Sequence, residues 1–126
     1  MYKICDFGWA AYAGRDRRTT FCGTPLYVSP EVLVGDCYDA KTDIWGLGVL
    51  TYELVYGMVP FPIMKQSDMV KIVKDPVHYP NWPAISPELL YLIKSMLRKD
   101  PEERPSLNQI LTSALLSGCP SEHTLT

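Results

Sequence analysis

The stretch KTDIWGLGVLTYELVY, residues 41–56, decides the fold because it predicts a helix that is buried on most of its sides. Its apolar residues fall all round a helical wheel instead of along a single stripe. They are Ile44, Trp45, Leu47, Val49, Leu50, Leu54 and Val55. Gly57 follows directly, and a glycine in the C′ position is expected to end the helix. We therefore expect a mainly α fold that is built around this segment.

Three further helices are predicted downstream, over residues 67–74, 87–97 and 106–115. The second begins with an N-cap serine, a first-turn proline and a first-turn acid, at Ser86, Pro87 and Glu88. The third opens with a capping box of Ser106 and Gln109. The apolar positions of the three are Met69, Val70, Ile72 and Val73; Leu89, Leu90, Ile93, Met96 and Leu97; and Leu107, Ile110, Leu111, Ala114 and Leu115.

The segment before the first helix predicts a long loop. Residues 9–37 contain three glycines and two prolines and have neither helical nor strand periodicity. Upstream of it, Tyr2 to Cys5 is the only stretch expected to form a strand. At the other end, residues 117–126 are expected to be a frayed tail. The prediction is a long loop followed by about four helices in one domain, or in part of one.

Composition and charge exclude several classes of function. The hydrophobic content of 47% is that of a globular chain, and a net charge of −2 without a basic run gives no footprint for nucleic acid or an anionic membrane. The four cysteines contain no C-x-x-C pair, so zinc spacing is absent and separate thiols in a reduced compartment are expected. Without a signal peptide or a membrane-length apolar run, we expect the cytoplasm or the nucleus.

Five short motifs stand in a fixed order along the chain. The first, Asp-Phe-Gly at residues 6–8, is weak by itself, because an aspartate before glycine is usually a turn. It is followed by Cys-Gly-Thr at 22–24, Tyr-Val-Ser-Pro-Glu at 27–31, Asp-Ile-Trp-Gly-Leu-Gly at 43–48 and Asp-Pro-Glu-Glu-Arg-Pro at 100–105. At these separations they resemble the second half of a protein kinase domain, the C-terminal lobe from Asp-Phe-Gly onward. The resemblance runs from Lys3 to about Leu116, and a partial kinase domain is expected over residues 1–116.

The closest branch is that of the Aurora kinases, because Asp-Phe-Gly-Trp at 6–9 and Arg-Arg-Thr-Thr-Phe-Cys-Gly-Thr at 17–24 resemble that family's activation segment. Two stretches depart from the family pattern. Pro25-Leu26 stands where Aurora kinases usually have Leu-Asp, and Ser-Ala-Leu at 113–115 replaces the common His-Pro-Trp. The Gly-Thr-Pro-x-Tyr form is shared with other basophilic Ser/Thr kinases, which stay open as the alternative.

The resemblance implies roles for residues near the start of the chain. Asp6 is expected to hold Mg²⁺ against the phosphates of ATP, and Phe7 and Gly8 complete that cofactor-binding motif. Thr20, with Thr19 beside it, resembles the activation-loop phosphorylation site, and Arg18 is the expected phosphate partner. Without the other motifs, a turn aspartate and a solvated charged loop would be the better explanations of these residues.

The resemblance also implies substrate-binding and structural residues. Gly23 and Thr24 match the segment that receives the acceptor residue, and Glu53 matches a position that takes a substrate arginine in many basophilic kinases. A solvated surface glutamate is the alternative for Glu53. The expected structural residues are the pair Glu31 and Arg104, the helix residue Trp45, and Asp43, which resembles the aspartate that hydrogen-bonds the catalytic loop.

These 126 residues contain no Gly-rich loop, no Val-Ala-x-Lys lysine and no His-Arg-Asp catalytic loop. Two hypotheses follow. The chain is part of an active Aurora-like Ser/Thr kinase that uses ATP and Mg²⁺, or it is a short binding or regulatory module without catalysis. By resemblance, the partners are protein substrates with basic residues before Ser/Thr and a regulatory protein, at centrosomes, spindles or chromosomes. In the 126 residues alone, several apolar side chains of residues 41–56 should lack cover.

Overall fold

The computed structural model of the chain describes residues 1–5 and 25–117, and every regular element within them is helical. The α-helices are α1 (Pro30–Leu33), α2 (Ala40–Tyr56), α3 (Val70–Lys74), α4 (Pro87–Met96) and α5 (Leu107–Leu111). The 3₁₀ turns are η1 (Pro25–Tyr27), η2 (Gln66–Met69) and η3 (Pro101–Glu103). The predicted mainly α fold is confirmed, and each of the four expected helical stretches contains a helix.

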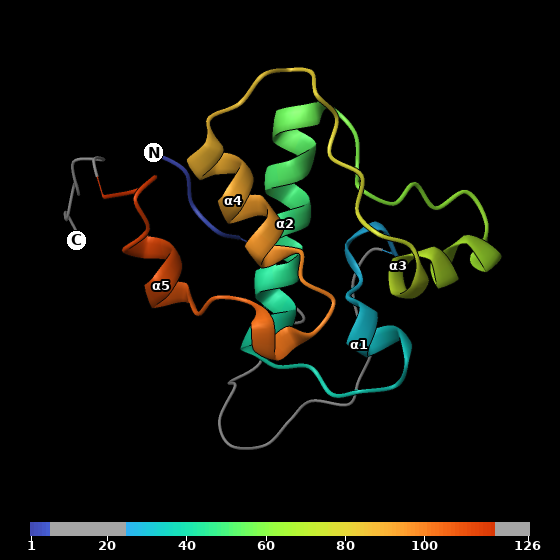
Figure 1. Cartoon of the computed structure of the whole chain (residues 1–126). Coiled ribbons are helices and arrows are strands. Elements are labelled where there is room, and N and C mark those ends of the chain that lie inside the picture. The colour runs from blue at the N-terminus through green and yellow to red at the C-terminus, as the bar shows by residue number, and fades with distance from the viewer. Residues whose placement is uncertain (6–24, 118–126) are drawn as a thin grey trace.

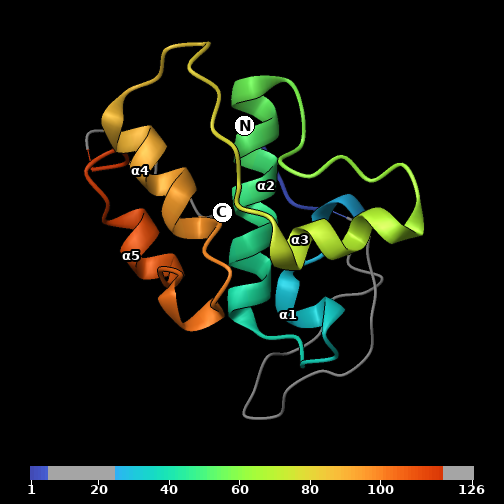
Figure 2. The ribbon, with the colours of Figure 1, turned by 45° about the vertical axis from the view of Figure 1, so that its right-hand side comes forward.

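The long helix α2 lies in the middle of the described part of the chain. The helices α4 and α5 lie on one side of it, and α1 and α3 lie on the other (Figure 1). The view turned by 45° shows the same order (Figure 2). Elements that are far apart in the sequence therefore meet through α2.

Both ends of α2 are fixed by the residues that the sequence places there. The Asp39 side chain accepts hydrogen bonds from the backbone N–H groups of Lys41 (2.8 Å) and Thr42 (3.3 Å), and Thr42 Oγ1 accepts one from the Asp39 N–H (3.3 Å). This capping box satisfies N–H groups that have no partner inside the helix. At the other end Gly57 has φ of +73°, the left-handed conformation that favours glycine. The predicted C-terminal glycine is confirmed.

The faces of α2 that meet other elements form the core. Trp45, Val49 and Tyr52 are at most 2% exposed and belong to the larger cluster. The other buried members of this cluster are Val28, Val32, Phe61, Ile72, Ile93 and Leu97. A smaller cluster lies between α2, α4 and α5 and contains Ile44, Leu92, Met96 and Ile110. Both clusters include residues of α2, so the core connects the elements on either side of this helix.

One face of α2 has no cover in the described part of the chain. Leu47, Leu50 and Leu54 are 38%, 44% and 77% exposed, and their spacing places them on the same side of the helix. We call these three residues the α2 stripe. The expectation that several side chains of this helix lack cover is confirmed, whereas burial on most sides holds only for the faces that α1, α3 and α4 approach.

Gly48 allows α2 and α4 to come close together. A Cβ atom built on Gly48 would lie 2.9 Å from Leu97 Cδ2 and 2.9 Å from Met96 Cβ, which is closer than carbon atoms pack. Both neighbours are buried, so neither side chain has free space to move away. Glycine is therefore required at this point of the helix interface.

The sequence-based prediction is wrong in part for three segments, residues 2–5, 106–115 and 67–74. Tyr2 to Cys5 form no strand and are exposed, since no described strand lies beside them to complete a ladder. The α5 helix ends at Leu111, and Leu107 and Leu111 are 58% and 57% exposed, so only Ile110 on this helix reaches the core.

The expected helix over residues 67–74 is divided into η2 and α3. The cause is Asp68, whose buried carboxylate accepts hydrogen bonds from the backbone N–H groups of Met64 and Lys65, both at 3.1 Å. A side chain that bonds the preceding backbone competes with regular helix geometry. Ile72 is buried as expected, but Val70 is 48% exposed.

Candidate functional site

Arg104 lies at the centre of a buried hydrogen-bond network. Its Nη1 and Nη2 donate to the two carboxylate oxygens of Glu31, each at 2.7 Å, and the residues Arg104 and Glu31 are 2% and 7% exposed. The remaining N–H groups donate to three backbone carbonyls, those of Arg98 (2.7 Å), Lys41 (2.8 Å) and Lys99 (3.2 Å). All five donors of the guanidinium are therefore used. The network joins α1, the start of α2 and the segment around η3.

The electrostatics of this pair keep Glu31 ionised. Burial raises the pKa of the Glu31 carboxyl, but the hydrogen bonds and the positive charge of Arg104 outweigh burial and hold that pKa below its ordinary value of 4.5. Thr42 Oγ1 also donates to Glu31, at 3.3 Å. The pair that the sequence singled out is thus brought together with all its polar groups engaged.

Trp45 lies directly beside this network. The Arg104 guanidinium is 5.1 Å from the centre of the indole ring, and Lys99 Nζ is 5.6 Å from it. Lys99 Nζ also lies 4.1 Å from the centre of the Phe61 ring and donates to the backbone carbonyl of Ile72. Burial lowers the pKa of Lys99 to about 8. Sequence reasoning missed Lys99, because no spacing rule distinguishes it from a surface lysine.

Glu53 is half-buried and is not free in the structure. The Tyr27 hydroxyl, from η1, donates a hydrogen bond to Glu53 Oε2 on α2. This hydrogen bond, together with burial and the charge of Glu53, raises the pKa of Tyr27. The bond ties η1, which directly follows Gly23 and Thr24 in the chain, to the predicted arginine receptor. Tyr27 was missed as a site residue, although the sequence signal was present in the Gly-Thr-Pro-x-Tyr pattern.

Asp43 lies in the first turn of α2, and its side chain is exposed. Partial desolvation and the neighbouring carboxylate of Asp39 raise the pKa of Asp43. Its predicted partner, the backbone of a catalytic loop, has no counterpart in these 126 residues. The role assigned to Asp43 stays a prediction.

The other predicted site residues lie outside the described part of the chain. They are Asp6, Phe7, Gly8, Arg18, Thr19, Thr20, Gly23 and Thr24. Within residues 1–5 and 25–117, no group of three or more His, Cys, Asp or Glu side chains could hold a metal ion. The prediction of a Mg²⁺ ligand therefore still rests on Asp6.

Comparison with known proteins decides the family. The family model for the protein kinase domain matches residues 1–116. The chain belongs to the protein kinase domain family. The helices of this kinase chain that surround the Glu31–Arg104 pair lie entirely within the matched region, in agreement with a partial C-terminal lobe.

Among individual relatives, the kinase chain is similar to several Aurora kinases. It is 42% identical to serine/threonine-protein kinase Aurora-1 of Arabidopsis thaliana over 110 residues, which covers 86% of this chain and 37% of the relative. It is 39% identical to an Aurora kinase of Dictyostelium discoideum, and this match covers 86% of this chain and 28% of the relative. The resemblance to Aurora kinases is confirmed.

A relative of a different name matches nearly as well. The ovarian-specific serine/threonine-protein kinase Lok of Drosophila melanogaster is 37% identical to this chain, and the match covers 95% of this chain and 27% of the relative. The kinase chain spans about a third of the length of these relatives. In its described part, none of the helices is both long and apolar enough to cross a membrane.

Proposed function

We propose that these residues form the activation segment and C-terminal lobe of an Aurora-like Ser/Thr kinase, which transfers the γ-phosphate of ATP to substrates with basic residues before the acceptor. The observation that carries this proposal is the Tyr27–Glu53 hydrogen bond. It holds the Glu53 carboxylate of α2 beside η1, which follows the proposed substrate-binding residues Gly23 and Thr24 in the chain. A guanidinium of the substrate is the natural partner for that carboxylate, through charge-assisted hydrogen bonds.

The cofactors of the proposed reaction are ATP and Mg²⁺. Of the residues in this chain, Asp6 would hold the metal, and a carboxylate oxygen is the ligand type that Mg²⁺ prefers. The bound metal would neutralise charge on the phosphates. Phe7 and Gly8 would keep the Asp6 carboxylate in place. Because one carboxylate does not complete a phosphoryl-transfer site, we propose that the 126 residues alone do not transfer phosphate.

Thr20 is the proposed switch of the activation segment. A phosphate there would add nearly two negative charges and would order the segment through arginines, with Arg18 as one partner. Thr19 is the neighbouring acceptor. The anchor for such ordering is the Glu31–Arg104 pair, since it fixes the downstream end of the segment against α2 and η3.

The function is tested by phosphate transfer from labelled ATP, using the full-length polypeptide that carries these residues. We expect transfer to a serine peptide with arginines before the acceptor, and none to a matched tyrosine peptide. Asp6→Asn should abolish the transfer. Equal labelling of both peptides would contradict the Ser/Thr assignment, and a turnover by the 126 residues alone that Asp6→Asn removes would contradict the proposal that they are inactive.

Glu53→Ala is expected to weaken the use of arginine peptides selectively. If the contact is a charged hydrogen bond, the loss in kcat/KM corresponds to about 1.5–3 kcal/mol on the arginine peptide, with little change on an alanine peptide. Tyr27→Phe is the matched control, because it removes the hydroxyl beside Glu53 and keeps the carboxylate. This variant should lower the preference for arginine less than Glu53→Ala does, because the carboxylate stays on α2. An equal loss on both peptides in Glu53→Ala would show that Glu53 is structural.

A further inference from the structure

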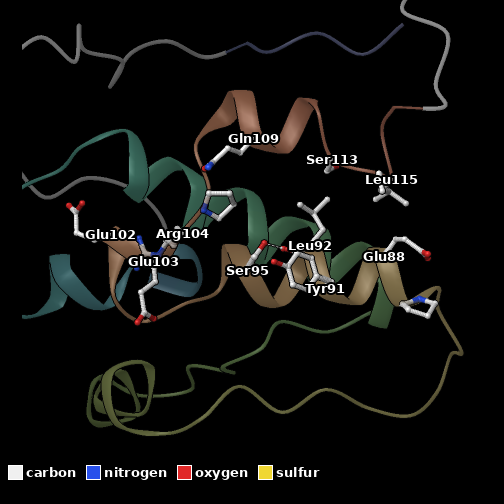
Figure 3. A pocket seen from close by; sticks show the side chains of 13 residues that line it. Glu88, Tyr91, Leu92, Ser95, Glu102, Glu103, Arg104, Gln109, Ser113 and Leu115 are labelled. Carbon is white, nitrogen blue, oxygen red and sulfur yellow. Dashed lines mark hydrogen bonds between the residues drawn. The ribbon is translucent and has the colours of Figure 1, made fainter.

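A cavity of about 710 Å³ lies between α4 and the segment around α5 (Figure 3). Its volume lies in the range of about 300–1,000 Å³ that is usual for ligand pockets. Tyr91, Leu92 and Ser95 line it from α4, while Gln109 and Leu115 line it from the opposite side (Figure 3). None of these residues belongs to the proposed substrate site.

The charge around this cavity is negative. Three glutamates line it, with Glu88 toward one end and Glu102 and Glu103 toward the other (Figure 3). The ion pairs of the described residues are Glu31–Arg104 and Asp68–Lys71, so none of these three carboxylates forms an ion pair with a described side chain. Arg104 also lines the cavity, but all its N–H groups are engaged. A guest that carries positive charge is favoured.

Two further observations indicate what kind of cation fits. Tyr91 lines the cavity and is 73% exposed, so most of this aromatic residue is accessible to a planar guanidinium. The Ser113 Oγ atom, also in the lining, is buried and has no hydrogen-bond partner in the described part of the chain. Arginine stacks on aromatic rings and bonds carboxylates through two parallel N–H groups, which a lysine ammonium cannot do.

We propose that the cavity between α4 and α5 is a docking site for an arginine-containing peptide segment of a partner protein. One arginine would lie near Glu88 and a second near Glu102 and Glu103, with the intervening residues over Tyr91. Seven residues of helix separate Glu88 from Ser95, which is a rise of about 10 Å, or about three residues of extended peptide. Because Ser95 lies between Glu88 and the two glutamates at the other end (Figure 3), the two arginines should be at least about three to four positions apart.

The position of the cavity keeps docking separate from phosphate transfer. The α4 and α5 helices lie on the opposite side of α2 from α1, which follows the segment that contains Tyr27 (Figure 2). A peptide bound between α4 and α5 would leave Glu53, which contacts Tyr27 of η1, accessible to a substrate arginine. Peptide binding at this site needs no phosphate transfer. Failure of the proposed function would therefore not disprove docking, and failure of docking would not disprove the proposed function.

The test measures the fluorescence anisotropy of a labelled peptide, Ala-Arg-Leu-Ala-Ala-Arg-Ala, with the full-length polypeptide that carries these residues. This probe has no phosphate acceptor. We expect saturable binding that weakens at high salt, and at least about fivefold weaker binding when both arginines are replaced by uncharged citrulline. Glu88→Gln/Glu103→Gln should weaken binding of the arginine peptide to the same degree.

The matched control is Asp36→Asn/Asp75→Asn, which removes two exposed carboxylates that do not line the cavity. It should bind the probe like the wild type. Tyr91→Ala should weaken binding without changing the salt dependence. Equal affinity for the citrulline peptide, or an equal loss in the control variant, would overturn the proposal. Displacement of the probe by a substrate peptide that depends on Glu53 would also overturn it, because the two sites would then be one.

Discussion

Replacing Arg104 with alanine is expected to lower the free energy of unfolding by about 3–5 kcal/mol. The reason is the carboxylate of Glu31, which is 7% exposed and would be left buried without its cation. Three backbone carbonyls would also lose their donor, those of Lys41, Arg98 and Lys99. The guanidinium further packs on Trp45, so the change would leave a hole beside the core.

The measurement is urea unfolding of the full-length polypeptide that carries these residues. Arg98→Ala serves as the matched control, because it removes an exposed arginine side chain six positions away and keeps the backbone carbonyl that Arg104 uses. The control should change the free energy of unfolding by about 0.5 kcal/mol or less. Similar losses in both variants would show that the network around Arg104 does not stabilise the fold.

The same pair predicts a pH dependence of stability. Because the folded state holds the pKa of Glu31 below 4.5, its contribution is fully present above that pH and is lost as the pH falls through the lower, folded-state pKa. The difference in unfolding free energy between wild type and Glu31→Gln should therefore shrink as the pH drops below about 4.5. A difference that stays constant between pH 7 and pH 3 would contradict this origin of the stability.

The second large effect concerns the α2 stripe, Leu47, Leu50 and Leu54. Purified alone, the 126-residue polypeptide is expected to associate with itself and to bind a hydrophobic dye strongly. Full burial of a leucine contributes about 1.5–3 kcal/mol, and these three side chains keep 38–77% of their surface exposed on one helix face. A continuous apolar face of this kind drives association. Replacing all three with glutamine should return the chain to a monomer in size-exclusion chromatography.

The control for this experiment replaces three exposed apolar residues that lie in separate segments of the chain, namely Val34, Met64 and Leu107. Scattered residues of this kind are normal on a protein surface, so their replacement by polar residues should leave the associated state unchanged. A monodisperse wild-type monomer with a sharp cooperative melt would contradict the prediction. That result would favour the alternative of a binding module that folds by itself.

Local sequence signals were sufficient for the main elements of the fold. The wheel pattern of residues 41–56 and the final Gly57 predicted α2, and Ser86 and Ser106 predicted where α4 and α5 begin. These signals work because caps and periodicity act over a few residues. The charge partner of Glu31 was predicted only through the family resemblance, since 73 residues separate it from Arg104.

Features that depend on long-range packing could not be read from the sequence. Asp68 looks like any polar helix residue until the chain before it folds back and offers two backbone N–H groups. Lys99 becomes unusual only because Trp45 and Phe61, from two other segments, surround its ammonium group. The cavity between α4 and α5 likewise needs both elements in place before its three glutamates belong to one site.

The separation of 73 residues between Glu31 and Arg104 also determines when during protein synthesis this pair can form. Ribosomes add about 5–20 residues per second, so Arg104 is made roughly 4–15 s after Glu31. During this interval the nascent chain contains the Glu31 carboxylate but not yet the arginine that pairs with it in the folded state. The α1 region therefore reaches its final packing only after translation has passed η3. A pause or truncation between these two residues would leave an incompletely folded lobe for chaperones to bind.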